Sequence, residues 1–259
     1  MGEIISSYGE KKVVEYFEDG MKILIKYGHG VGDLLMFMPA FHRLRDLYPK
    51  VDIKLYVECG QEQIFESVRE INEDEYDYIF EIHFPMSEGT GFTKGQLCCV
   101  SELGIEPVFN IVKLPRKSSP FVAVHFHGTA LPDSVGCPED VAGAIWHDII
   151  DFGKIPIECH FEHVFHNPVN TKFDFIDRHV RTCVANLDNL VGLIQHSFAF
   201  IGVASGPFIT ALSTFPSRTL FLEKHHKLED YTRLGVAKVN LDKGYLKGSV
   251  GNWLASLPE

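Results

Sequence analysis

Short runs of β-branched and aromatic residues alternate along the chain with longer segments whose apolar residues recur at helical spacing. Such alternation is typical of a parallel sheet whose strands are joined by helices. The predicted strands are 21–27, 52–58, 76–83, 121–127, 155–161, 198–203, 217–223 and 236–241. The predicted helices are 34–48, 61–71, 97–103, 138–152, 186–197 and 208–213. We expect the first of these helices to end or kink at Pro39, because proline removes a helical hydrogen bond.

The apolar pattern is interrupted once, in the segment KLPRKSSP at 113–120, and then starts again. Of the 259 residues, 45% are hydrophobic, and 20 of them are phenylalanine, which is enough to build a large core. The sequence therefore predicts two α/β halves, a domain 1–116 and a domain 117–259.

Composition and charge exclude several classes of function. The net charge of −11 argues against a general nucleic-acid binder, because phosphates are neutralised by clustered lysine and arginine. No apolar run reaches the about 18–20 residues of a membrane span, and the first twenty residues lack the apolar core of a signal peptide. The six cysteines form no CxxC pair, so we expect reduced thiols and a cytoplasmic protein.

The first turn that can carry chemistry is GHGVGD at 28–33. It joins a predicted strand to a helix, the place where open α/β sheets bind ligands. Its glycines let the backbone approach a ligand, and the helix start offers unpaired N–H groups. Two interpretations of Asp33 stay open at this point. It is either the N-cap of the helix or a general base at the mouth of a crevice.

The second turn is GVASGP at 202–207, again between a strand and a helix. Ser205, Gly206 and the start of the following helix are suited to hold a phosphate through backbone amides and the helix dipole. The alternative is an ordinary turn in which Ser205 only caps the helix. Two such turns in one chain favour a nucleotide ligand.

Two segments resemble the family 9 glycosyltransferases, the heptosyltransferase-like group. KYGHGVGDLLMFMPAFHRLRDLYPKVDIKLYV is similar to the family's N-terminal signature, a strand, a G-x-G-D turn and an apolar helix with an internal proline. LDNLVGLIQHSFAFIGVASGPFITALSTFPSRTLFLE is similar to its donor-binding region, with a D-[ST]-G-P turn between strand and helix. Together the segments cover roughly a third of the chain, in the family's order.

The resemblance implies a GT-B fold, two Rossmann-like domains with the active site between them, in a short version. It implies transfer of a sugar from a nucleotide-diphosphate donor to an acceptor hydroxyl, with inversion and without a bound metal or other cofactor. Asp33 would be the catalytic base, beside an acceptor-side loop of Gly28, His29, Gly30 and Gly32. The implied donor-binding residues are Asp188, which would bind the ribose, and Ser205, Gly206, Pro207, His125, His127 and Thr129.

The family's acidic residue before the Ser or Thr of the second turn is Ala204 here, and the histidine that often follows the turn is Ile209. A basic residue that the family places near the start of the second half is not evident. His125, His127 and Thr129 occupy that loop, where imidazolium can pair with phosphate. Lys224, His225 and His226 are a second source of positive charge, or else a solvated loop.

Three functions therefore remain open. The first is a glycosyltransferase with a nucleotide-sugar donor and a glycan, lipid or other hydroxyl acceptor. The negative net charge of the protein makes a nucleic acid an unfavoured acceptor. The second is a catalytically lapsed GT-B protein that binds a nucleotide or partner without turnover. The third is another GT-B enzyme, such as a nucleotide-sugar epimerase.

We expect no metal site at His160, His163 and His166, because a strand would turn alternate side chains to opposite faces.

Overall fold

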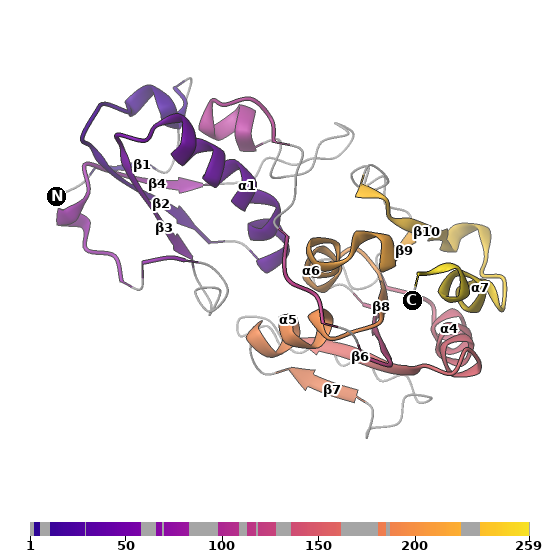
Figure 1. Ribbon diagram of the computed structural model, residues 1–259. Coiled ribbons are helices and arrows are strands. Elements are labelled where there is room, and N and C mark those ends of the chain that lie inside the picture. Colours follow the sequence, from indigo (N-terminus) through magenta and orange to yellow (C-terminus); the bar gives the residue numbers. More distant parts are fainter. Residues whose placement is uncertain are drawn as a thin grey trace. The chain divides into compact units, whose positions relative to one another are not determined.

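The computed structural model describes residues 3–5, 11–28, 30–57, 66–68, 70–82, 98–108, 113–117, 119–127, 136–161, 181–184, 187–223 and 234–258. The chain divides into two compact units (Figure 1). Unit 1 is formed by residues 1–112, and unit 2 by most of residues 113–259.

Unit 1 is built on a parallel sheet with the strand order β1-β4-β2-β3. Its strands are β1 (Glu3–Ile5), β2 (Lys22–Tyr27), β3 (Asp52–Val57) and β4 (Tyr78–Ile82). The helical elements are η1 (Val13–Tyr16), α1 (Val31–Leu47), η3 (Glu73–Glu75) and the π-helical turn η4 (Cys99–Leu103). Residues 23–25 of β2 are completely buried, as expected for a central strand of a parallel sheet covered on both faces.

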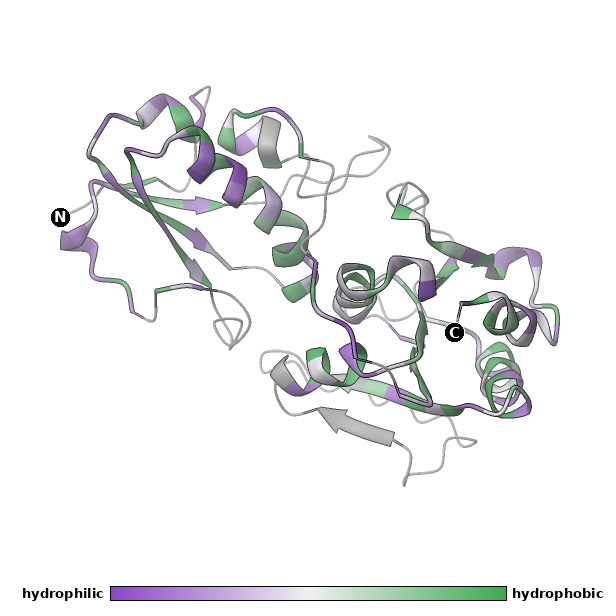
Figure 2. Cartoon of the chain, viewed as in Figure 1, coloured by the Kyte–Doolittle hydropathy of each residue, from purple (hydrophilic) through white to green (hydrophobic). Residues whose placement is uncertain are grey.

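Helix α1 differs from the prediction at its start and at Pro39. It begins at Val31, three residues earlier than predicted, and it continues through Pro39 to Leu47. We expected the helix to end or kink at Pro39: it does not end there, and the kink stays a prediction. Proline removes one hydrogen bond, but the side chains around it, such as Leu35 and Met38, are buried, and this packing outweighs the loss. Figure 2 shows the N-terminal half of α1 as hydrophobic and the C-terminal half as hydrophilic.

The predicted helix 61–71 is not found in the part of it that the structure describes. Residues 66–68 are not helical, and the Val68 N–H donates to the Leu55 carbonyl oxygen at 2.8 Å. Residues 61–65 lie outside the described residues. Strand β1 was not predicted, because three residues are too few to show a periodic pattern.

Unit 2 is built on a second parallel sheet, with the order β10-β9-β8-β5-β6-β7. Its strands are β5 (Phe121–His125), β6 (Ile155–Phe161), β7 (Arg181–Val184), β8 (Ala199–Gly202), β9 (Thr219–Glu223) and β10 (Ala237–Asn240). The helices are α4 (Glu139–Asp151), α5 (Leu187–Gln195), α6 (Gly206–Thr214) and α7 (Ser249–Ser256), with the short turns η5 (Pro216–Arg218) and η7 (Leu241–Lys243). Numbered within the unit, the strands follow the order 3-2-1-4-5-6, which is that of the Rossmann fold.

The core of unit 2 includes one face of β5, β8 and β9, packed with side chains of α4 and α7. Helix α7 was not predicted from the sequence. It is attached through Asp148 of α4, a buried carboxylate that accepts a hydrogen bond from the Tyr245 hydroxyl at 2.6 Å and from the Gly248 N–H at 2.8 Å. A long-range contact of this kind positions the last helix and leaves no local signal in the sequence.

Residues 113–117, at the start of unit 2, contact two helices of that unit through their backbone. The Leu114 N–H donates to the Ser213 carbonyl at 2.7 Å, and the Lys117 N–H donates to the Gln195 carbonyl at 2.8 Å. These carbonyls belong to the last turns of α6 and α5, where carbonyl oxygens have no helical partner. Residues 113–117 therefore complete the ends of two helices.

Three of the cysteines can be assigned. Cys98, Cys137 and Cys159 are free thiols and are buried, which confirms the prediction of reduced core cysteines for these three. Among the helices that the structure describes, none has the length and apolar character needed to cross a lipid bilayer.

Candidate functional site

The strand order of unit 2 places one topological switch point between β5 and β8. The chain goes from β5 to β6 on one side and returns to β8 on the other. Open α/β sheets bind ligands at such a point, outside the carboxyl ends of the strands. Here the last residues of the two strands, His125 and Gly202, are direct neighbours, and the Val203 N–H donates to the His125 carbonyl at 3.0 Å.

His125 is held in a defined orientation at this edge. Its side chain is only 8% exposed, and its Nδ1 lies 2.9 Å from the carbonyl oxygen of Cys159 on β6. Because a carbonyl oxygen only accepts, this contact requires the proton on Nδ1. His127 follows two residues later and is half-buried. The structure therefore places two of the predicted donor-binding residues at the switch point.

The second predicted turn lies at the same edge. Ser205 is the N-cap of α6: its Oγ accepts from the Phe208 N–H at 3.4 Å and donates to the Val203 carbonyl at 3.1 Å. The capping interpretation of Ser205 is thus confirmed. The cap does not exclude a binding role, because the start of α6 brings the positive end of its dipole to the switch point. Gly206 and Pro207 form the first turn of the helix.

Gly202 is required by the packing of the sheet itself. An added Cβ would lie 2.8 Å from the His125 carbonyl oxygen and 2.8 Å from the Phe200 ring. Real Cβ atoms do not approach other atoms so closely, so a side chain here forces the strands apart. The glycine lets β8 approach β5 at the point where the two candidate segments meet.

The sheet of unit 1 has its own switch point, between β2 and β4. Strand β2 pairs with β3 on one side and with β4 on the other, and α1 follows β2 directly. Gly30 is the N-cap of α1, with φ −66° and ψ 161°, and no atom lies within 4 Å of the position that a Cβ would take. Neither the backbone conformation nor the packing of the described residues requires a glycine here. Gly28 is exposed and Gly32 is buried in α1.

Asp33 lies inside the first turn of α1, as its third residue. Since Gly30 is the N-cap, the interpretation of Asp33 as the cap is wrong. Asp33 is half-buried and follows β2, whose last residue is Tyr27. Burial raises the pKa of the Tyr27 hydroxyl well above its ordinary value, and the charge of Asp33 raises it further.

Some predicted site residues cannot be placed. His29, Thr129, His163, His166, Lys224, His225 and His226 lie outside the described residues, as do the side chains of His160 and Asp188. Within the described part of the chain, no group of three or more His, Cys, Asp or Glu side chains is arranged to hold a metal ion.

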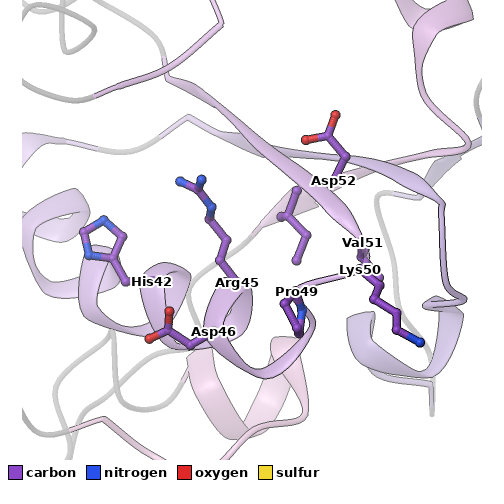
Figure 3. A pocket seen from close by; sticks show the side chains of 8 residues that line it. His42, Arg45, Asp46, Pro49, Lys50, Val51 and Asp52 are labelled. Atoms are coloured by element: carbon purple, nitrogen blue, oxygen red, sulfur yellow. The ribbon is translucent and has the colours of Figure 1, made fainter.

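A cavity of about 710 Å³ lies at the other end of α1 (Figure 3). It is lined by His42, Arg45, Asp46, Pro49, Lys50, Val51, Asp52 and Ile53. Two of its charged groups are already paired, Lys50 with Asp19 at 2.6 Å and Asp52 with Lys54 at 3.1 Å. From Asp33 to His42 the helix rises about 14 Å, and the cavity lies beside the amino end of β3. The cavity is therefore separate from the carboxyl ends of the strands of unit 1, where α1 begins with Asp33 in its first turn.

Comparison with known proteins gives a result only at the level of structure. No known sequence family matches the chain, and no curated protein matches it in sequence. The iron-containing dodecameric glycosyltransferase TibC of enterotoxigenic E. coli, also solved with ADP-D-beta-D-heptose, has a TM-score of 0.56 and 16% identity to this chain. The match covers 79% of this chain and 60% of TibC, so the chain spans less than two thirds of TibC.

Two further structures match over nearly the whole chain. The E. coli heptosyltransferase WaaC, solved with ADP, has a TM-score of 0.51 and 12% identity, covering 92% of this chain and 94% of its own. A family 9 glycosyl transferase from Veillonella parvula has a TM-score of 0.54 and 10% identity, covering 92% and 96%. The predicted fold class is confirmed: the chain has the α/β fold of the heptosyltransferases and family 9 glycosyltransferases, with two Rossmann-like parallel sheets.

Proposed function

We propose that the protein is a glycosyltransferase that moves a sugar from a nucleotide-diphosphate donor to an acceptor hydroxyl. One observation carries the proposal: in each unit, a strand-to-helix turn with suitable chemistry lies at the topological switch point of the sheet. Unit 1 presents the Asp33 carboxylate there, and unit 2 presents the start of α6. The fold that the chain shares with known glycosyltransferases supports this interpretation.

In the proposed reaction, unit 2 binds the donor. The diphosphate lies at the start of α6, where the dipole and the amides around Gly206 favour negative charge. His125 and His127 lie at the same edge, and their imidazolium forms would add positive charge. A protein with a net charge of −11 has to neutralise phosphate through such local groups and not through a broad basic surface. Asp188 is proposed to bind the ribose.

Asp33 is proposed to act as the base. The carboxylate removes the proton of the acceptor hydroxyl as the hydroxyl oxygen attacks the anomeric carbon. The bond from that carbon to the diphosphate breaks, and the electron pair leaves with the diphosphate. Attack from the face opposite the leaving group inverts the anomeric configuration. In this scheme backbone amides and imidazolium stabilise the leaving group, so no metal ion is needed.

The structures with ADP and ADP-heptose suggest the first donor to test, because TibC and WaaC bind these nucleotides. The acceptor is proposed to be a glycan, a lipid-linked sugar or another hydroxyl compound. Binding of the donor is tested by thermal unfolding with a panel of nucleoside diphosphates and nucleotide sugars, ADP-heptose included. A ligand present at 100 times its Kd stabilises the folded state by about 2.7 kcal/mol, which shifts the unfolding temperature measurably.

The panel is run on the wild type, on Asp33→Asn and on Asp46→Asn. Asp46 is a matched control because it is an exposed carboxylate on the same helix, near the far end of α1. We expect one nucleotide family to stabilise all three proteins. We also expect release of the diphosphate, with an acceptor extract present, from the wild type and from Asp46→Asn but not from Asp33→Asn. If no nucleotide raises the unfolding temperature, the proposal is wrong. Binding without turnover would identify a lapsed protein instead.

A further inference from the structure

Three neighbouring strands of unit 1 carry a polar or aromatic side chain at the same place, one residue before their carboxyl ends. These residues are Lys26 on β2, Tyr56 on β3 and Glu81 on β4. Lys26 is the direct neighbour of Tyr56 in one strand pair and of Glu81 in the other (Figure 1). Neighbouring strands lie about 4.8 Å apart, so the three residues form one row across the sheet, the polar row.

The polar row lies on the face of the sheet opposite α1. The Tyr27 ring stacks on Phe37 of α1, with the ring centres 5.0 Å apart. Successive side chains of a strand point to opposite faces, so Lys26 points away from α1, and its paired neighbours point the same way. The ion pair between Lys26 Nζ and Glu81 Oε1, at 2.9 Å, agrees with this placement.

The ion pair of the polar row is half-buried, with 32% of the Lys26 side chain and 30% of the Glu81 side chain exposed. Nearer the middle of the same face, Leu24 and Ile79 are buried. Half-buried charges lose part of their hydration, and an apolar pair often stabilises a protein as well or better. The pair is therefore better explained by its place, near the ends of the two strands that form the switch point of the sheet.

The polar row offers the contacts that a sugar needs. A lysine ammonium has three donors and a carboxylate roughly four acceptor sites, so the pair can keep its mutual bond and also bind hydroxyl groups. Tyr56 is half-buried and adds an aromatic ring. A sugar carries hydroxyl groups around its rim and C–H groups on its faces, and C–H groups pack on the electron-rich face of such a ring. Because Glu81 balances the charge of Lys26, the row favours an uncharged polar ligand over an anion.

We propose that the polar row is a saccharide-binding subsite: Glu81 and Lys26 bind hydroxyl groups of the acceptor, and Tyr56 packs against its ring. This inference rests on the proposed function and deepens it, because it makes the acceptor a saccharide, free or attached to a carrier. The row and the proposed base belong to the same end of the sheet, since Asp33 lies in the first turn of α1, directly after β2.

The test presents the full chain with an array of defined glycans, with and without ADP. Phosphatidylglycerol vesicles and a single-stranded DNA oligonucleotide are the two other probes. A glycan that binds is titrated by calorimetry into the wild type, Glu81→Gln, Tyr56→Ala, Tyr56→Phe and Lys54→Met. Lys54 is the matched control, because it lies on the same face of β3, two residues before Tyr56, and is paired with Asp52 at 3.1 Å. Thermal unfolding checks that every variant is folded.

We expect Glu81→Gln and Tyr56→Ala each to raise the Kd of the glycan at least about tenfold, because each removes a contact made to the ligand. Tyr56→Phe keeps the ring and should raise the Kd less than Tyr56→Ala. Lys54→Met should bind like the wild type within a factor of about two, since an exposed ion pair contributes little. If Glu81→Gln and Tyr56→Ala bind the glycan as tightly as the wild type, or if only vesicles or DNA bind, the subsite is wrong.

Exchanging the two charges, Lys26→Glu together with Glu81→Lys, separates a ligand contact from a structural pair. The exchange keeps an ion pair between β2 and β4 but reverses its donors and acceptors. A folded exchange variant that has lost glycan binding supports the subsite. A folded variant that binds the glycan with the wild-type Kd contradicts it.

Turnover distinguishes failure of the subsite from failure of the proposed function. If Asp33→Asn releases diphosphate at the full rate while the variants of the polar row lose glycan binding, the base assignment fails and the subsite stands. If Asp33→Asn is inactive and the variants of the polar row bind and use the glycan like the wild type, the subsite is wrong and the proposed function stands. If no glycan binds with or without ADP, the subsite is wrong.

Discussion

Gly30 offers a sharp test of whether the first turn serves a ligand or the fold. Its backbone, with φ −66° and ψ 161°, is one that any L-residue adopts, and no atom lies within 4 Å of the place that an added methyl group would take. Replacing glycine by alanine at such a position stabilises a protein by about 0.4–1 kcal/mol through the unfolded state. Alanine is a poorer N-cap than glycine, by roughly 0.5–1 kcal/mol. The two effects nearly cancel.

Gly202→Ala is the matched control in the other turn. There the added Cβ would meet the His125 carbonyl oxygen and the Phe200 ring, both at 2.8 Å. Overpacking of this kind costs about 1–3 kcal/mol. The structure therefore predicts that two glycine-to-alanine changes in similar turns have different consequences. Gly202→Ala lowers the free energy of unfolding, and Gly30→Ala leaves it unchanged within about 1 kcal/mol.

The assay combines urea unfolding with steady-state kinetics of diphosphate release. If the turn closes around the acceptor, the methyl group of Gly30→Ala occupies ligand space, and kcat/KM for the acceptor should fall at least about tenfold, a loss of about 1.4 kcal/mol of transition-state stabilisation. Gly30→Ser, which restores a good cap but also adds a Cβ, should be equally impaired. Wild-type activity in both Gly30 variants would refute the assignment of this loop to the acceptor side.

Three further predictions concern single side chains. Asp33→Asn should reduce turnover about 10²–10⁴-fold, and Asp46→Asn should not, measured as diphosphate release. Ser205→Ala removes the N-cap of α6 and should lower the free energy of unfolding in urea by about 1 kcal/mol, and it should also weaken nucleotide binding in calorimetry. Tyr245→Phe should cost about 1–2 kcal/mol of stability, because Asp148 loses a hydrogen bond. Burial and the hydrogen bond to Asp148 raise the pKa of Tyr245. The stabilisation that the Tyr245 hydroxyl provides is therefore complete below about pH 10 and is lost as the pH rises further. Urea unfolding should show a smaller loss of stability at high pH in Tyr245→Phe than in the wild type.

The sequence predicted β5, β8 and β9 of unit 2 well because they are nearly continuous apolar runs. All four residues of β8 are buried, and so are the last four of β5, as in parallel strands covered on both faces. Elements without such a signal were missed. Strands β1 and β7 have three and four residues, and α7 is positioned by its contact with Asp148.

The candidate site was predicted in outline and not in its details. The strand-to-helix turns were found because glycine and a helix start are visible in the sequence. The position of Asp33 inside the first turn of α1 was not predicted, because the N-cap depends on backbone angles that place the helix start at Val31. Nor was the contact between His125 and the Cys159 carbonyl, since 34 residues separate them. Tyr27 was assigned to a buried strand, and the stacking of its ring on Phe37 of α1 was not predicted.

We propose above all that a nucleotide sugar binds at the carboxyl ends of β5 and β8. Backbone amide resonances of the labelled protein, followed by NMR during titration with ADP-heptose, test this directly. We predict shifts concentrated at Phe126, His127 and residues 202–208, with smaller shifts at 30–33 when an acceptor is added. Shifts confined to the cavity at 42–53, or no shifts with any nucleotide sugar, would contradict binding at this edge of the sheet.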